Sequence, residues 1–412
     1  MRPLKIALLC RDYWLESQLH YHEEGGTTRQ LAEAVAALGH EVVVLSQSSE
    51  VRKLKKSQVG ALETWVSPRD LHRNLIAGLR DKIGAKAHAY PKVHTDALAL
   101  REFLKRRGPF DVIWAQTESP DGLIAAFAAQ RGLKMPPVLL QIQSLPCRFE
   151  KGEPVFIDKH PLRLAFRRAK RILAPSEMVV NLLHGYAGPG LSADELHAKV
   201  RVVSPNLQSA VFRAAQEPLT APMMDRVLFL GAINQRKGAP VFLKALPKTE
   251  ASKRISTFVM IGDFTEYNPR FMRRWEEAKE VMRAQLTGAR VEYLGRVSTF
   301  EVLRQIKLAC AVVIPSLFDP FSKGVVEALI LGRPVITTDK VGSASLVQAH
   351  QCGIVIPASN PDALARAIDV ILDPIVPFVA NAQRVGPHLF HEFLPETIAP
   401  RIAQHLFEIA VS

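Results

Sequence analysis

Short runs of apolar, β-branched residues alternate with helix-like segments along most of the chain. Residues 5–10 form the first such run, and residues 27–40 carry apolar side chains at helical spacing and end at a glycine. Residues 41–47 form the next run, so this part of the chain predicts a strand, a helix and a strand of a parallel sheet. The same pattern predicts further strands in residues 111–116, 137–143, 171–176 and 200–205.

A second series of apolar runs begins near residue 225. The runs are continuous rather than alternating, which is typical of strands buried on both faces. They predict strands in residues 225–233, 256–264, 289–297, 310–316, 333–339 and 352–357. Helices are expected in residues 238–248 and 322–332, and a terminal amphipathic helix in 396–411. An additional amphipathic helix in 265–285 would line a ligand site or cover the sheet, and we favour the cover.

The two series predict two Rossmann-like, doubly wound α/β domains that face each other across a cleft. Residues 1–207 form the first and residues 208–384 the second, while residues 385–412 form a C-terminal helical segment that packs back towards the first domain. The prolines around residues 206–225 indicate an exposed hinge. Because ligands of doubly wound sheets bind beyond the carboxyl ends of the strands, the strand-to-helix loops are where chemistry is expected.

Composition is that of a globular protein, with 48% hydrophobic and 23% charged residues. No apolar stretch approaches the roughly 20 residues of a membrane span, and the four cysteines are too widely separated to form a metal-binding motif. We therefore expect a cytoplasmic protein with reduced thiols. The dinucleotide-binding GxGxxG and the P-loop motifs are absent from the sequence.

The net charge of +13 is unevenly distributed. Residues 51–110 contain 14 Lys or Arg against 5 Asp or Glu, a local excess of +9. A nucleoside diphosphate, an anionic lipid head group or a nucleic acid would suit such a surface, and so would plain solvation. Nucleic acid ranks last, because no nucleic-acid-binding signature accompanies the charge. Peripheral contact with the inner membrane face through residues 51–110 is a further hypothesis.

A pair of glycines, Gly25 and Gly26, precedes the first predicted helix. Free N–H groups and the positive end of the helix dipole favour an anion there. A glycine pair before a helix is more often an ordinary turn. Thr27 or Thr28 is expected to cap this helix.

The first strand of the second series leads into Arg236, Lys237 and Gly238 before a helix. An arginine can donate to two oxygens of a diphosphate while a lysine supplies a point charge. The alternative is a solvated, basic helix start. We favour the diphosphate, because cations at the positive end of a helix are unfavourable without an anion.

Two carboxylates flank a turn in the sequence LFDPFSKGVVEAL, residues 317–329. Asp319 follows a predicted strand, and Glu327 lies about one turn inside the following helix. The N–H groups of residues 322–325 would bind phosphate, and each carboxylate would accept hydroxyls of a sugar ring on its own side. The alternative is a capping Asp with a solvated Glu, but the apolar surroundings of Glu327 argue for a bound partner.

These residues, with GAINQRKG upstream and CGIVIP downstream, resemble the family 4 retaining glycosyltransferases of GT-B fold. That resemblance implies transfer of a sugar from a nucleoside-diphosphate sugar to an acceptor hydroxyl, with retention of configuration and without a metal or other cofactor. The acceptor would be a sugar, a lipid-linked sugar or another small molecule. The most specific likeness covers residues 228–357.

The resemblance also implies roles for individual residues. Asp319, Arg236 and Lys237 would be catalytic, with Asp319 at the donor sugar and the two cations at the diphosphate. Glu327 would hold the ribose. The remaining positions implied by the resemblance are the phosphate loop Phe321, Ser322, Lys323, Gly324 and Val325, the base-reading backbone of Gly295 and Val297, and the acceptor-side residues Gly25, Gly26 and Gln143.

Three positions depart from the family pattern. Ala232 stands where the family usually has an arginine, so Arg236 would replace its charge. Asp319 is one methylene shorter than the usual glutamate. Gln143 stands where many members have a histidine; it cannot carry a proton, but it can hydrogen-bond a sugar hydroxyl. These departures leave two alternatives to an active transferase, namely a degenerate GT-B protein that binds without turnover and a sugar-nucleotide epimerase.

Overall fold

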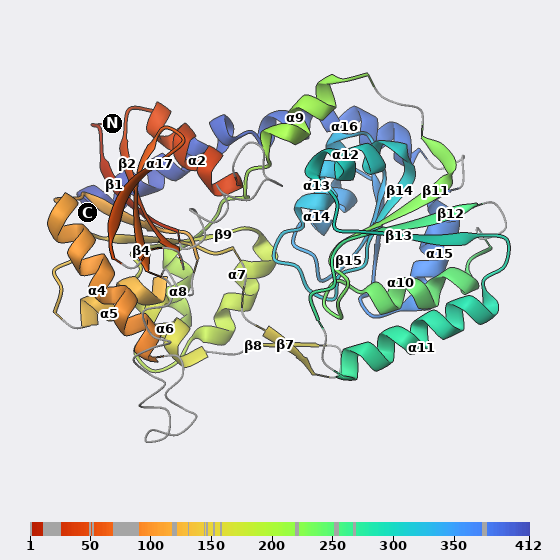
Figure 1. Cartoon of the computed structure of the whole chain (residues 1–412), viewed down its shortest axis with the longest axis horizontal. Helices are drawn as coiled ribbons and strands as arrows, with labels where there is room; N and C mark the ends of the chain where they lie inside the picture. The colour runs from red at the N-terminus through yellow and green to blue at the C-terminus, as the bar shows by residue number, and fades with distance from the viewer. Residues whose placement is uncertain are drawn as a thin grey trace. The chain divides into compact units, whose positions relative to one another are not determined.

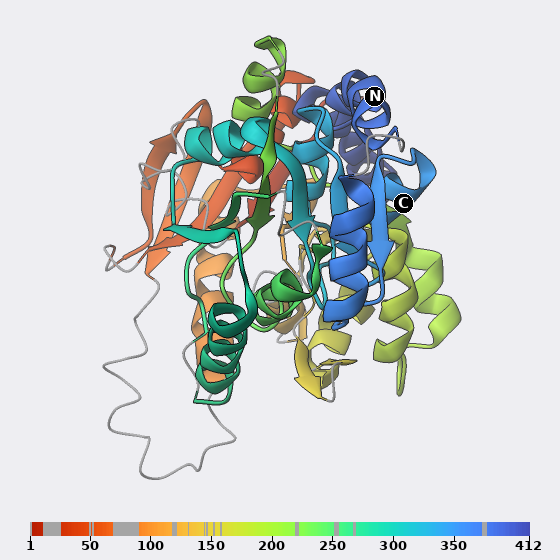
Figure 2. The same ribbon diagram turned by 90° about the vertical axis from the view of Figure 1, so that its right-hand side faces the viewer.

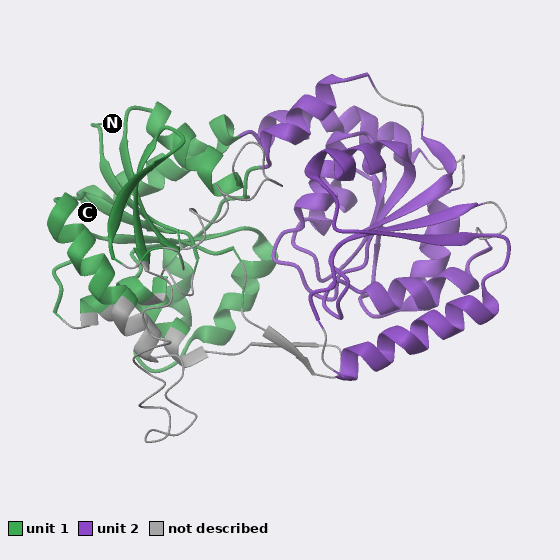
Figure 3. Cartoon of the chain, in the orientation of Figure 1, with its two compact units in different colours: residues 1–146, 156–206, 395–412 green, residues 147–155, 207–394 purple. Residues whose placement is uncertain are grey.

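The computed structural model (Figure 1) describes most of the chain as two α/β parts. The described residues are 2–10, 26–48, 51, 53–68, 90–117, 122–130, 132–143, 145, 147–150, 153–156, 159–218, 222–250, 255–266, 269–372 and 377–412. The chain divides into two compact units (Figure 3). Unit 1 contains residues 1–146, 156–206 and 395–412, and unit 2 contains residues 147–155 and 207–394.

Unit 1 is built on an eight-stranded sheet in the order β10-β9-β6-β5-β1-β2-β4-β3, in which only β3 runs antiparallel to its neighbour. Its strands are β1 (Lys5–Leu9), β2 (Glu41–Ser48), β3 (Lys55–Val59), β4 (Leu62–Pro68), β5 (Val112–Ala115), β6 (Val138–Gln141), β9 (Arg171–Ala174) and β10 (Val200–Val202). Its helices are α2 (Thr27–Ala37), α4 (Tyr90–Arg107), α5 (Leu123–Gln130), α6 (Lys159–Arg168), α7 (Glu177–Leu183), α8 (Ala193–Lys199) and α17 (Pro395–Val411).

Unit 2 is built on a six-stranded, fully parallel sheet in the order β13-β12-β11-β14-β15-β16. Its strands are β11 (Met223–Leu230), β12 (Thr257–Ile261), β13 (Arg290–Gly295), β14 (Ala309–Ile314), β15 (Val335–Thr338) and β16 (Gly353–Ile356). Its helices are α9 (Ser209–Gln216), α10 (Ala239–Ala245), α11 (Pro269–Gln285), α12 (Thr299–Leu308), α13 (Lys323–Ile330), α14 (Ala344–Ala349), α15 (Pro361–Ile371) and α16 (Phe378–Glu392). A separate two-stranded ribbon pairs β7 (Cys147–Glu150) with β8 (Glu153–Phe156).

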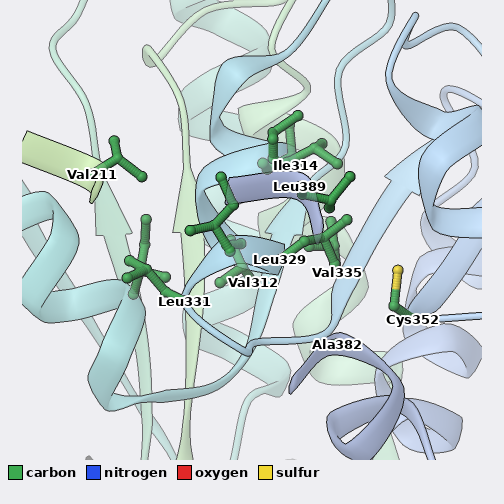
Figure 4. Close-up of a cluster of buried hydrophobic side chains, with 14 of the residues drawn as sticks. Val211, Val312, Ile314, Leu329, Leu331, Val335, Cys352, Ala382 and Leu389 are labelled. Carbon is green, nitrogen blue, oxygen red and sulfur yellow. The ribbon is translucent and has the colours of Figure 1, made fainter. Parts of the chain in front are cut away.

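Helices cover both faces of the unit 2 sheet, as its continuous apolar strands predict. On β11, Leu228 packs into one core while Val227 and Phe229 pack into the other. The first core receives side chains from α9, α12, α13 and α16, among them Val211, Leu329 and Leu389 (Figure 4). The second receives those of α10, α11 and α15. Helix α11 runs beside α10 (Figure 2) and buries Phe271 and Trp275, so its predicted role as a cover of the sheet is confirmed.

Two features differ from the sequence-based expectations. The predicted exposed hinge at residues 206–225 contains helix α9, whose Val211 and Phe212 are buried in a core of unit 2. Its apolar positions recur at helical spacing, a signal outweighed in our prediction by the flanking prolines. The antiparallel hairpin of β3 and β4 was also missed, because the excess of basic residues obscured its alternating pattern.

Helix α17 belongs to unit 1, although it follows all of unit 2 in the sequence. Its Ile398, Ile402 and Leu406 lie in the same buried cluster as Leu31 and Val35 of α2. Each of these α17 side chains is essentially inaccessible to solvent. The preceding helix α16 belongs to unit 2, so the chain passes from unit 2 to unit 1 between residues 394 and 395.

The packing of α17 predicts that unit 1 depends on it for stability. Replacing Ile402 by alanine removes a fully buried side chain and should lower the free energy of unfolding by about 2–5 kcal/mol. Val411→Ala on the same helix is the matched control, because Val411 is exposed and should change stability by less than about 0.5 kcal/mol. Urea unfolding followed by circular dichroism measures both, and equal effects of the two substitutions would contradict the assignment.

Candidate functional site

The candidate site lies where the strand order of the unit 2 sheet changes direction. Strand β11 is flanked by β12 on one side and by β14 on the other. Loops that leave the carboxyl ends of such a pair run to opposite faces of the sheet and leave room for a ligand between them. The loops in question are residues 231–238 after β11 and residues 315–322 after β14, which are the two loops that the sequence singled out.

These two loops are in direct contact. The N–H of Leu317 donates to the carbonyl of Arg236 at 2.7 Å. Gly238 has a φ of +75°, and a Cβ at this position would lie 2.0 Å from the carbonyl oxygen of Pro315. Only glycine therefore allows the first loop to turn into α10 this close to the second loop.

An ion pair joins the same two loops. The Nζ of Lys237 lies 2.5 Å from Oδ2 of Asp319, and their side chains are 19% and 9% exposed. Backbone hydrogen bonds fix Asp319 on its other side, since its N–H donates to the carbonyl of Lys340 and its carbonyl accepts from the N–H of Gly342. The predicted phosphate-binding lysine and the predicted sugar-binding carboxylate are thus each other's partners in this structure.

Helix α13 begins directly beside this ion pair. Ser322 is its N-cap, in an extended conformation and without a side-chain capping bond, and its first turn contains no acidic residue. The N–H of Val325 donates to the carbonyl of Ser322 at 3.3 Å, and the first N–H groups of an α-helix have no acceptor four residues earlier within it. Gly324 lies close to β11 and β14, since a Cβ there would be 3.0 Å from Leu230 and 3.2 Å from Ile314. The start of α13 therefore offers donors and positive potential to an anion.

Glu327 lies one turn further along α13 and has an unusual environment. Part of its surface is still accessible, yet desolvation by the surrounding protein raises the pKa of its carboxyl, against a weaker opposing effect of Lys323. Within the described part of the chain, its carboxylate makes no hydrogen bond or ion pair. The partner that the sequence leads us to expect for this carboxylate is not supplied by those residues.

The loop after β11 is hydrogen-bonded to the loop after β12. The side chain of Asn234 accepts from the N–H of Lys237 at 2.7 Å and donates to Thr265 at 2.7 Å. Arg236 is partly exposed, and its guanidinium has no partner among the residues that the structure describes. A cation that has no counter-ion among the described residues therefore precedes Lys237 in this loop. Ala232, also partly exposed, opens the same loop.

Gly295 and Val297 lie at the end of β13, two strands away from β11 in the sheet. The carbonyl of Gly295 accepts from the N–H of Gly262 at 3.0 Å, so this oxygen is already engaged. Val297 packs its side chain against the unit 2 core. The structure thus places these two residues on the same edge of the sheet as the ion pair but not in contact with it.

The predicted acceptor-side residues belong to unit 1. Gly25 lies outside the described residues. Gly26 is the N-cap of α2 with a φ of −66°, and no side chain caps the helix, so the expected threonine cap is wrong. Gln143 is exposed and donates to Gln116 at 2.8 Å, which continues to Gln141. Gln116 and Gln141 were not predicted as site residues, although Gln116 directly follows the buried strand β5 and Gln141 ends the buried strand β6.

Two family models match the chain. The model described as "Glycosyl transferase 4-like domain" matches residues 25–198, and the model described as "Glycosyl transferases group 1" matches residues 225–373. The second match includes Lys237, Asp319 and Glu327. The chain belongs to the group 1 glycosyltransferase family.

Known proteins that are similar to this chain share modest identity with it. A glycogen synthase of Mycobacterium tuberculosis is 26% identical over 222 residues, 53% of this chain and 49% of that protein. The chain thus spans about half the length of this curated relative. Sucrose-phosphate synthase from Thermosynechococcus elongatus matches with a TM-score of 0.72 at 18% identity, with both chains fully covered. HepE from Anabaena in complex with UDP-glucose matches with a TM-score of 0.65 at 16% identity, covering 98% of this chain and all of that one. The fold is therefore GT-B.

Two properties of the described residues bear on other classes of site. They contain no group of three or more His, Cys, Asp or Glu side chains placed to hold a metal ion. Within the same residues, no helix has both the length and the apolar character that a membrane crossing would require.

The ion pair predicts an unequal effect of removing one or both of its charges. Lys237→Met leaves the carboxylate of Asp319 buried without a counter-ion, which should lower the free energy of unfolding by about 3–5 kcal/mol. Adding Asp319→Asn removes the uncompensated charge and should restore most of this loss. Urea unfolding of the single and double variants measures the difference. A double variant as unstable as Lys237→Met would contradict the pairing.

The raised pKa of Glu327 predicts a pH-dependent stability. Because the folded protein binds this proton more tightly than the unfolded chain, ionisation of Glu327 destabilises the fold as the pH rises above the ordinary carboxyl value of 4.5. Glu327→Gln should therefore stabilise the ligand-free protein at about pH 8, by about 1–3 kcal/mol. The gain should shrink towards about pH 4.

Thermal unfolding at several pH values measures this gain. The control is Glu277→Gln on α11, whose side chain is exposed and should show no such trend. A Glu327→Gln variant that is less stable than the parent at about pH 8 would show that the carboxylate has a stabilising partner.

Proposed function

We propose that this protein transfers a sugar from a nucleoside-diphosphate sugar to an acceptor hydroxyl, with retention of anomeric configuration. The observation that carries the proposal is the convergence of Lys237, Asp319 and the start of α13 on the β11–β14 switch point. One turn along that helix lies the carboxylate of Glu327, which has no partner among the described residues. A diphosphate with a sugar on either side matches this set of groups in charge and in order along the chain.

Each group has a role in binding the donor. The diphosphate lies against the N–H groups of residues 321–325, where the helix dipole and Lys237 neutralise its charge. Arg236 supplies the second cation that an arginine at position 232 would otherwise provide. Glu327 accepts hydroxyls of the ribose, and this contact offsets its desolvation. Asp319 accepts a hydroxyl of the transferred sugar.

The chemical step relies on charge stabilisation. The bond between the anomeric carbon and the diphosphate oxygen breaks while the acceptor oxygen bonds to the same face of that carbon. The proton of the acceptor hydroxyl moves to the departing phosphate oxygen, so no protein base is required. Lys237 and Arg236 stabilise the negative charge that develops on the leaving group. The glutamine at position 143 is compatible with such a reaction, because proton transfer does not pass through it.

A solved structure of the same fold guides the choice of the first donor to test. HepE, of the same fold, is described in complex with UDP-glucose, which makes UDP-glucose the first donor to test. Unit 1 would hold the acceptor near Gly26 and Gln143. The acceptor would be a sugar, a lipid-linked sugar or another small molecule with a free hydroxyl.

Contact with an anionic membrane through residues 51–110 stays a prediction. Part of the basic charge is neutralised within the protein, because Arg107 pairs with Glu41 and Glu63, and Lys56 also pairs with Glu63. Burial alone would raise the pKa of Glu63, but its hydrogen-bond donors outweigh this and lower it to about 2. Residues 69–89 lie outside the described structure. Sedimentation with anionic and neutral liposomes tests the contact.

Incubation of the purified protein with UDP-, GDP-, ADP- and dTDP-sugars, with and without a panel of sugar acceptors, tests the function. We expect one donor to be consumed and a glycosylated product of unchanged anomeric configuration to form. Binding without consumption of any donor would favour a non-catalytic binding protein. Formation of an epimeric donor in the absence of acceptor would favour an epimerase.

The role of Glu327 predicts a loss of donor affinity. Glu327→Ala removes an ionised acceptor of the ribose hydroxyls and should weaken binding of the preferred donor by about 1–3 kcal/mol. Isothermal titration calorimetry measures this change. Glu277→Ala, on the exposed surface of α11, is the matched control and should leave the affinity unchanged. Equal affinities of the parent and Glu327→Ala would remove the ribose assignment.

A further inference from the structure

Four side chains of unit 1 form a continuous hydrogen-bonded chain. The indole Nε1 of Trp114 donates to Oε1 of Gln141 at 2.9 Å. The side-chain amide of Gln116 donates to the same oxygen at 3.2 Å, and that of Gln143 donates to Oε1 of Gln116 at 2.8 Å. Trp114, Gln116 and Gln141 are at least 95% buried, whereas Gln143 is exposed.

This hydrogen-bonded chain of side chains lies at the switch point of the unit 1 sheet. Strand β1 is flanked by β2 on one side and by β5 on the other, and the N–H of Gln116 donates to the carbonyl of Leu9 at the end of β1. Gln141 ends β6, the neighbour of β5. The exposed end of the chain therefore emerges where a doubly wound sheet binds its ligands.

The direction of the hydrogen bonds is fixed by their buried end. An indole nitrogen can only donate, so the atom of Gln141 that faces Trp114 must be its oxygen. That oxygen then requires the NH2 of Gln116 on its other side, because two amide oxygens would repel each other. The oxygen of Gln116 consequently faces Gln143, and Gln143 must donate to it through its NH2.

The consequence at the surface is that Gln143 turns its oxygen outward. This oxygen has no partner among the residues that the structure describes, and it can only accept a hydrogen bond. A glutamine without such a scaffold could rotate to offer either its oxygen or its NH2. Here the three buried side chains select the oxygen.

We propose that Gln143 binds the acceptor by accepting a hydrogen bond from one of its hydroxyls, with Gln116, Gln141 and Trp114 as positioning residues. The inference rests on the proposed function and specifies its acceptor. The hydroxyl that attacks the donor gives its only proton to the departing phosphate, so it cannot also donate to Gln143. The acceptor therefore carries a second hydroxyl near the one that becomes glycosylated, as a sugar or another polyol does.

The first experiment tests the direction of the chain by NMR of the side-chain amides in glutamine-labelled protein, with the Gln143 signal assigned through Gln143→Met. In the parent, one N–H of Gln143 is hydrogen-bonded and should exchange with water about tenfold more slowly than that of a free glutamine. Trp114→Phe removes the obligatory donor, so this protection should be lost. Trp65→Phe is the matched control, because it also removes an indole hydrogen bond in the same sheet but leaves the chain intact.

A rescue separates this role from a general effect on folding. In the double variant Trp114→Phe with Gln141→Glu, the ionised carboxylate at position 141 can only accept, so the original direction and the protection of Gln143 should return at about pH 8. A Trp114→Phe variant with the protection of the parent, or a double variant without recovery, would overturn the proposal.

The second experiment tests the class of ligand on the same signal. D-Glucose, which can donate hydrogen bonds, should shift the Gln143 side-chain resonances, and methyl tetra-O-methyl-glucopyranoside, which has no O–H, should not. Equal shifts with both, or none with glucose, would overturn the proposal. Binding of UDP-, GDP-, ADP- and dTDP-sugars is measured on the same samples. If none of these donors binds while these results hold, the proposed function fails; if one binds while they fail, only the role of Gln143 is rejected.

Discussion

The ion pair between Lys237 and Asp319 is the interaction on which the site depends. It joins the two loops that leave β11 and β14, at the point where the unit 2 sheet reverses its winding. The cores on both faces hold these strands in register, and Gly238 lets the loops approach closely enough for the charges to meet. The attraction between two charges that are mostly removed from water offsets their desolvation only when the surrounding structure holds them in good geometry. The same frame holds the start of α13 and the carboxylate of Glu327 beside it.

The two units carry different kinds of polar group at their switch points. Unit 2 concentrates charge and helix N–H groups, which suits an anionic ligand. Unit 1 uses a neutral chain of amides that begins at a buried indole and ends at a surface oxygen, which suits a hydroxyl. This division agrees with a reaction between a charged donor and a neutral acceptor. In the proposed reaction a glutamine in place of a histidine is compatible with transfer, since that glutamine would accept a hydrogen bond from a hydroxyl and move no proton.

The sequence predicted the parts that depend on local pattern. The continuous apolar runs marked the strands of the unit 2 sheet and those of the unit 1 sheet except β3 and β4. The residues after β11 and β14 were recognised because glycine, cations and acids cluster there. The pairing of Lys237 with Asp319 was not predicted, because it depends on the pairing of strands about 80 residues apart. The amide chain was missed for the same reason, since Gln116 and Gln141 meet only through the register of β5 and β6. Prolines obscured helix α9, whose apolar face packs on a core that sequence alone cannot place.

The most direct test of the account is a crystal structure of the protein with UDP. The account predicts the diphosphate on the N–H groups of residues 321–325, with the ammonium of Lys237 within hydrogen-bond distance of a phosphate oxygen and the carboxylate of Glu327 on the ribose hydroxyls. A nucleotide bound elsewhere, or one bound here while Glu327 stays without a partner and Lys237 contacts Asp319 alone, would contradict it.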